Sequence, residues 1–148
     1  MNMAVRELYQ EMIMDHNKNP RNHHDMPDAT VTANGFNPLC GDKLSVYCKL
    51  VDDKIDDVSF VGCGCAISQA SASLMTDALK NQTITDAHAI FERFHLMMTQ
   101  AGSTEGLPSK LMVLEGVKEF PARVKCATLA WHTMEAALNK SAVVVSTE

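Results

Sequence analysis

The sequence predicts an α+β fold, and three observations lead to this prediction. Apolar and polar residues alternate between positions 44 and 60, which is typical of a hairpin with one buried face. Apolar residues at the three-and-four spacing of amphipathic helices occur before and after this hairpin. The 148 residues suit one domain, 1–148, that can bury a core without disulfides. We therefore expect a small antiparallel sheet packed against helices.

The composition narrows the class of protein. Hydrophobic residues make up 46% and charged residues 21% of the chain, which is typical of a folded domain and argues against disorder. No run approaches the roughly 20 apolar residues of a membrane-spanning helix, and the amino-terminal residues do not resemble a signal peptide. We therefore expect a cytoplasmic protein without a membrane partner. A net charge of -5 argues against nucleic acid as the main partner.

The first helix is predicted from about Met3 to about Asn17. Its apolar residues form one stripe at helical spacing: Val5, Leu8, Tyr9, Met12 and Ile13. Pro20 ends the helix, because a residue before proline avoids helical dihedral angles. His16, His23 and His24 lie in or just after this end, and we interpret them as exposed loop histidines.

Strands are predicted next. A short one is expected from Ala29 to Gly35, and a firmer one contains four alternating apolar residues: Leu44, Val46, Cys48 and Leu50. Cys48 lies on the apolar side, so we assign it a structural role as a small buried side chain. A turn at Asp52-Asp53-Lys54 then leads into a returning strand through Val58 and Phe60.

This hairpin has a consequence for four polar residues at its two ends. Cys40 and Asp42 precede the first long strand, and Cys63 and Cys65 follow the returning one. Antiparallel pairing places both ends of a hairpin at the same edge of the sheet. We therefore expect these four residues to lie close together.

Helices are predicted for the rest of the chain. One runs from Ala66 to Ala78, and a second begins at a Thr83 or Thr85 cap, with His88 and His95 on its solvated face. Residues 101–120 contain three glycines and are predicted to form a surface segment that covers or flanks the site, with a short helix at 109–114. A last helix begins at Pro121, ends near Lys140 and carries Cys126 on its apolar stripe, and the tail to Glu148 is expected to fray.

The cysteines suggest a metal site. Cys40, Cys65 and Cys126 come from three separate turns or helix starts, and with Asp42 they could form a four-ligand zinc site of net charge -2, which Arg123 and Lys125 would partly offset. Cys65 precedes a helix and Cys126 follows a lysine, so both thiols are predicted to have lowered pKa values. The spacing lacks the C-x-x-C repeats of structural zinc modules. Buried incidental cysteines and a thiol nucleophile therefore remain alternatives.

Four motifs in order carry a family resemblance over nearly the whole chain. They are Leu8-Tyr9 through Asn19-Pro20-Arg21-Asn22, then Asn37-Pro38-Leu39-Cys40-Gly41-Asp42, then Gly64-Cys65-Ala66-Ile67-Ser68, and finally Phe120-Pro121-Ala122-Arg123-Val124-Lys125-Cys126. Together they resemble the IscU/SufU/NifU-N family of iron–sulfur cluster assembly proteins. The resemblance implies a three-stranded antiparallel sheet packed against a layer of helices, which agrees with the order of elements above.

The resemblance also implies a function. By position, Cys40, Asp42, Cys65 and Cys126 match the metal ligands of the family, and Cys40 matches the thiol that accepts persulfide sulfur. In SufU-like proteins these residues hold zinc, and the sulfur comes from a cysteine desulfurase of the SufS type. In IscU-like proteins equivalent residues bind iron and assemble a transient [2Fe-2S] cluster, which is the alternative. A structural zinc domain that only binds a partner is a third possibility.

Three features favour the SufU-like branch. Lys125 stands where IscU-like proteins have histidine, the run 120–123 replaces their chaperone-recognition motif, and residues 101–119 resemble an insertion of SufU-like proteins. Cys63 departs from that branch, because its flanks resemble the IscU pattern. We interpret Cys65 as the ligand and Cys63 as an alternate ligand or second sulfur carrier. The predicted protein is thus a zinc-dependent, sulfurtransferase-like carrier that acts with a desulfurase.

Overall fold

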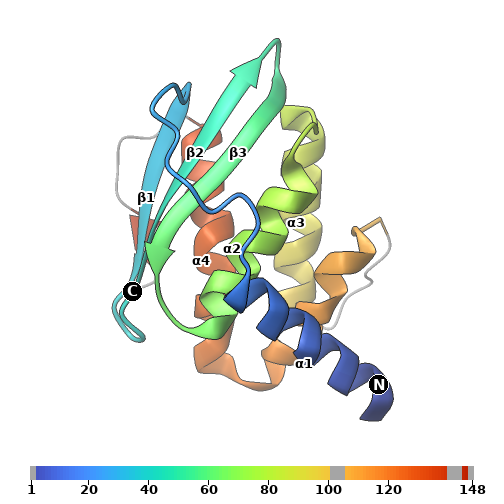
Figure 1. Ribbon diagram of the computed structural model, residues 1–148. Helices are drawn as coiled ribbons and strands as arrows, with labels where there is room; N and C mark the ends of the chain where they lie inside the picture. The colour runs from blue at the N-terminus through green and yellow to red at the C-terminus, as the bar shows by residue number, and fades with distance from the viewer. Residues whose placement is uncertain (1–2, 101–105, 140–144, 147–148) are drawn as a thin grey trace.

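The computed structural model describes residues 3–100, 106–139 and 145–146 (Figure 1). Its elements, in chain order, are α1 (Met3–Lys18), β1 (Val31–Asn37), β2 (Asp42–Val51), β3 (Lys54–Cys63), α2 (Ala66–Leu79), α3 (Ile84–Thr99), η1 (Ser109–Glu119), α4 (Pro121–Leu138) and β4 (Val145–Ser146). The predicted α+β fold is confirmed, because strands β1 to β3 form an antiparallel sheet that packs against helices. Helix α4 ends at Leu138, which agrees with the predicted end near Lys140, although Lys140 itself lies outside the described residues.

The sheet has the strand order β3-β2-β1-β4. Strands β1, β2 and β3 pair in an antiparallel manner, as the alternation predicts. The two residues of β4 pair in parallel with Gly35 and Phe36 of β1, so the prediction of a frayed tail is wrong for Val145 and Ser146. A two-residue strand is too short to show an alternating pattern, which is why the sequence gives no sign of it.

The other edge of the three antiparallel strands is also partly covered. The segment after α1 crosses β3, where the Phe60 amide donates to the Asn22 carbonyl at 3.0 Å. His23 forms an isolated bridge with Phe60, and their rings lie 4.9 Å apart. The sheet therefore has a contact with another segment along each of its outer antiparallel strands.

The helices pack on one face of the sheet, as Figure 1 shows for α2 and α4. Helix α4 approaches β1 closely at Gly35, where a Cβ would collide with Thr133 Oγ1. Between α4 and α3, the rings of Trp131 and Phe94 stack 4.3 Å apart. The indole Nε1 of Trp131 donates to Ser71 Oγ of α2 at 3.1 Å. None of the described helices is both long and apolar enough to cross a membrane.

The segment before α4 differs from its prediction as a surface segment. Residues 109–119 form the 3-10 helix η1, and four of its side chains are buried in the core: Leu111, Val113, Leu114 and Val117. A 3-10 helix has three residues per turn, so its apolar residues do not show the 3.6-residue period of an α-helix. The glycines around it also favoured a loop. Residues 101–105 lie outside the described residues.

Three histidines are also less exposed than predicted: His16, His88 and His95. His88 is half-buried, with its Nδ1 2.7 Å from Glu135 Oε1. His16 is buried between α1 and α2, where its Nδ1 lies 2.7 Å from Ser73 Oγ, and this burial lowers its pKa. His95 is half-buried, with Phe91 and His132 as ring neighbours. His23 and His24 are exposed, as predicted. His16 lies three residues after Ile13 and four after Met12, so it continues the apolar stripe of α1. The α3 histidines lie within one turn of buried apolar residues of that helix.

Candidate metal centre

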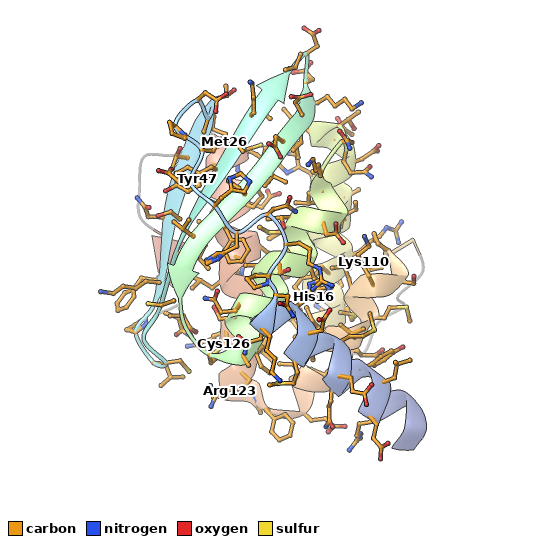
Figure 2. The ribbon with its side chains drawn as sticks, viewed as in Figure 1. His16, Met26, Tyr47, Lys110, Arg123 and Cys126 are labelled. Carbon is orange, nitrogen blue, oxygen red and sulfur yellow. The ribbon has the colours of Figure 1, made fainter. Side chains whose placement is uncertain are left out.

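Three segments of the chain meet at one end of the sheet. They are the turn between β1 and β2, the link from β3 to α2, and the first turns of α4. Figure 2 shows Cys126 and Arg123 of α4 at this end of the molecule. The predicted convergence of the hairpin ends is confirmed, because the backbone amide of Cys65 donates to Asp42 Oδ1 at 2.9 Å.

The β1–β2 turn presents Cys40. Its ends are fixed because Asn37 and Asp42 pair directly across the two strands. The Gly41 amide closes the turn on the Asn37 carbonyl at 2.8 Å, with Gly41 at a φ of 73°, a left-handed conformation that favours glycine. Cys40 is half-exposed in this turn, whereas Asp42 is completely buried.

Cys40, Asp42 and Cys126 form a compact group of potential metal ligands. One ligand atom from each residue lies within 4.8 Å of the others. Cys40 Sγ and Cys126 Sγ are 3.3 Å apart. Two thiolates on a tetrahedral zinc with Zn–S bonds of about 2.3 Å would be about 3.8 Å apart. The three donors thus fit a zinc ion after a small opening of the sulfur pair.

Cys65 lies beside this group but caps helix α2. Its Sγ accepts a hydrogen bond from the Ser68 amide at 3.4 Å, which is the position of an N-cap side chain. The compact group of three ligands within the described residues does not include it. Cys65 is nevertheless close enough to Cys126 to help raise its pKa. Its assignment as fourth ligand therefore stays a prediction.

Cys63 is exposed at the end of β3, where it pairs opposite Lys43. It lies outside the compact group of three ligands in the described part of the chain. Its predicted role as an alternate ligand or second sulfur carrier stays a prediction.

The electrostatics of Cys126 differ from the prediction. Burial raises the pKa of its thiol, and hydrogen bonds with Cys40 and Asp42 raise it further. The predicted lowering by position is therefore wrong for the metal-free site, because desolvation of a completely buried thiolate outweighs a basic neighbour in the sequence. A bound metal ion would reverse this, since coordinating thiols are deprotonated.

The two predicted cationic neighbours are placed differently. An Arg123 nitrogen lies 3.6 Å from Cys40 Sγ, and the nearby thiols, with Cys126 first, raise the pKa of the guanidinium. Lys125 is exposed on α4. Arg123 is therefore the cation that contacts the ligand group.

Two residues of the site were not singled out from the sequence. Asn37 donates from Nδ2 to Asp42 Oδ2 at 3.0 Å and lies 3.5 Å from Cys126 Sγ. Gly64 allows the chain to pass Asp42, because a Cβ there would collide with Asp42 Oδ1. Both lie within motifs that carry the resemblance, but their contacts depend on strand register, which the motifs alone do not give.

Comparisons with known proteins agree with this architecture. Residues 8–143 match the family described as the NifU-like N terminal domain. The chain is 41% identical over 140 residues to the "Zinc-dependent sulfurtransferase SufU" of Bacillus subtilis, covering 94% of this chain and 95% of that protein. It is 38% identical to the "Iron-sulfur cluster assembly scaffold protein IscU" of Streptococcus pyogenes serotype M1, covering 93% and 87%.

A solved structure is similar over most of the chain. The putative iron–sulfur cluster assembly scaffold protein for the SUF system from Fervidobacterium islandicum AW-1 superimposes with a TM-score of 0.84 at 36% identity. The match covers 90% of this chain and 98% of the other. The predicted sheet and helix layer are thus found in an experimentally determined relative.

Proposed function

The chain belongs to the family of NifU-like N-terminal domains, and from this premise we propose that it is a zinc-bound sulfur acceptor in iron–sulfur cluster assembly. The whole chain, 1–148, would act as one cytoplasmic domain. The observation that carries the proposal is the group of Cys40, Asp42 and Cys126, in which Cys40 alone is on the exposed side. A relative named as a zinc-dependent sulfurtransferase supports it.

We assign the zinc ligands as Cys40, Asp42, Cys65 and Cys126. Zinc would keep the sulfurs as thiolates at neutral pH, although burial raises the pKa of the free Cys126 thiol. Asp42 is a harder ligand than a thiolate, which favours exchange at the site. Cys40 is half-exposed and Asp42 is completely buried, so a partner that contacts this turn would reach Cys40 and leave Asp42 in place.

Cys40 is the proposed sulfur acceptor. Its thiolate would attack the terminal sulfur of a persulfide on a cysteine desulfurase of the SufS type. The sulfur–sulfur bond of that persulfide would break, the enzyme's cysteine would leave as a thiolate, and Cys40 would carry the persulfide. No electrons are gained or lost overall. The Arg123 guanidinium, 3.6 Å from Cys40 Sγ, would stabilise the attacking thiolate.

A second candidate function is an assembly scaffold. The same thiols would bind iron and sulfide as a transient [2Fe-2S] cluster and deliver it. Relatives named as IscU scaffold proteins, including one at 38% identity, support this alternative. The two functions predict different metal contents.

The first test measures metal and acid-labile sulfide in the anaerobically purified protein. The sulfur-acceptor function predicts about one zinc per chain, as a single four-ligand site would hold, and no sulfide. Bound iron with stoichiometric sulfide, together with little effect on a desulfurase, would favour the scaffold.

The second test measures turnover of a cognate cysteine desulfurase with and without the protein. The parental protein should stimulate turnover, and Cys40→Ala should abolish this stimulation. Cys63→Ala is the matched control, because Cys63 is an exposed cysteine outside the compact ligand group of the described chain. Unchanged stimulation by Cys40→Ala would refute the assignment of Cys40, and loss of stimulation in Cys63→Ala would identify Cys63 as a second carrier.

A further inference from the structure

Asn37 lies at the base of the turn that carries Cys40 and is completely buried. It is the last residue of β1, directly opposite Asp42, the first residue of β2. Its carbonyl accepts the Gly41 amide at 2.8 Å, which closes the turn. The backbone of Asn37 is therefore fixed from both sides, and its side chain cannot reach solvent.

The side-chain amide of Asn37 faces two of the proposed ligands. Its Nδ2 donates to Asp42 Oδ2 at 3.0 Å and lies 3.5 Å from Cys126 Sγ. Both acceptors are completely buried. When ligated, both would be anionic, and a hydrogen bond to a charged acceptor is roughly twice as strong as a neutral one. One buried amide thus connects ligands from two different elements, β2 and α4.

The ligand group is therefore held unevenly. Each oxygen of Asp42 has its own buried or half-buried donor, since Oδ1 accepts from the Cys65 amide at 2.9 Å and Oδ2 accepts from Asn37. Cys126 is anchored in α4 beside the same amide. Cys40, by contrast, is half-exposed in the turn, and its cationic neighbour is the exposed Arg123. One side of the site is fixed by the interior, and the other faces the solvent.

Because Cys40 is both a proposed zinc ligand and the proposed sulfur acceptor, it would have to leave the zinc before it attacks the persulfide. We propose that Asn37 is a positioning residue that holds Asp42 and Cys126 in the site during this step, an inference that rests on the proposed zinc function. Without the Asn37 amide, Asp42 Oδ2 loses the donor that fixes it, while Oδ1 still accepts from the Cys65 amide, so the carboxylate can rotate away from the metal position. Cys126 loses its buried donor at the same time. Zinc is then released as a whole instead of losing only the Cys40 sulfur.

The test compares the rate of zinc release from the loaded protein to an excess of a chromogenic chelator. Asn37→Ala should release zinc about tenfold faster or more, in the range found when residues that orient metal ligands are removed. The cobalt(II)-substituted variant should also show altered thiolate-to-cobalt and d–d absorption bands. These readouts need no desulfurase, so they are independent of sulfur transfer.

Asn34→Ala is the matched control. Asn34 lies on the same strand and accepts a hydrogen bond from Ser45 Oγ across the same strand pair, but its side chain is exposed. This variant should release zinc at the parental rate. Equal acceleration by Asn34→Ala would show a general weakening of the hairpin and would overturn the positioning role.

Asn37→Ser provides a second variant that retains a donor in a smaller side chain. Asn37→Ser should release zinc faster than the parental protein and slower than Asn37→Ala. If Asn37→Ala does not fold, Asn37→Ser takes its place in the comparison with Asn34→Ala. Parental release rates in these variants would overturn the role of Asn37 and leave the zinc function standing. A parental protein that binds neither zinc nor cobalt would overturn the zinc function and this inference together.

Discussion

Cys48 and Cys126 are both completely buried, yet their surroundings differ in kind. Cys48 lies in the centre of β2, and burial raises the pKa of its thiol to about 12. The charge of Asp57 makes a smaller contribution in the same direction. Cys126 is surrounded by Cys40, Asp42 and Asn37, which offer two further metal ligands and a hydrogen-bond donor. Burial alone therefore does not distinguish a core thiol from a ligand. The other donors within reach make that distinction.

The largest expected effect is on zinc content. Replacing Cys126 removes a sulfur from the compact group, so Cys126→Ala should lose nearly all bound zinc, measured by elemental analysis of the purified protein. Bound zinc should raise the thermal stability of the parental protein, because a ligand stabilises the state that binds it. Cys126→Ala should lose this gain together with the zinc. If Cys126→Ala kept its zinc, Cys126 would not be a ligand, and the donors around it would not distinguish it from the core thiol Cys48.

A weaker effect is expected when a neighbour of the ligands is changed. In Gly64→Ala the new Cβ would collide with Asp42 Oδ1, so we expect zinc affinity to fall about tenfold, as when an orienting contact is lost. Gly116→Ala is the control, because a Cβ there meets nothing within 4 Å. Competition titration with a zinc chelator measures both. Equal affinities in the two variants would show that Asp42 can shift without cost to the metal.

Cys48→Ala should change stability and leave the metal site intact. Removing the sulfur leaves a small cavity in the sheet core, which should lower the free energy of unfolding by about 1–2 kcal/mol. Urea denaturation of the zinc-loaded protein measures this loss. A variant that also lost zinc would show that the core and the site are coupled, which would weaken the comparison.

The smallest effect concerns pH in a region away from the thiols. Burial lowers the pKa of His132 in the folded state, and neighbouring His95 lowers it further. As pH falls below about 6.5, the ordinary histidine value, the unfolded chain binds the proton first, so stability should fall until the pH passes the folded value. His132→Gln should flatten this fall in urea midpoints measured on the Cys126→Ala background, where metal loss cannot contribute.

The exposed His24 supplies the matched control for this measurement. His24→Gln makes the same substitution at an exposed position, so it measures the effect of the replacement itself on the urea midpoints. An unchanged slope in His132→Gln would assign the acid sensitivity to other groups, with the buried His16 as the next to test.

Much of the fold and part of the site were predictable from local patterns. The alternation around Cys48 predicted β2 and its buried face, and antiparallel pairing predicted that Asp42 and Cys65 would meet. Strand pairing is strongly constrained when one face is buried, so this inference needed no knowledge of the full structure.

The remaining features depend on contacts between distant segments. The burial of His16 depends on Ser73, which is 57 positions away, and the role of Asn37 depends on its register opposite Asp42. The apolar stripe of the last helix predicted the burial of Cys126, but its raised pKa also depends on hydrogen bonds with Asp42 and with Cys40, which is 86 positions away. Such features follow from packing between segments that are distant in the sequence.

The coverage of the sheet edges bears on how the protein behaves at high concentration. An unpaired outer strand offers free amides and carbonyls to other chains, which is a common start of aggregation. Here the β4 residues lie along β1, and the Asn22 carbonyl already accepts the Phe60 amide of β3. The sheet is thus partly protected at both edges against uncontrolled strand-to-strand association.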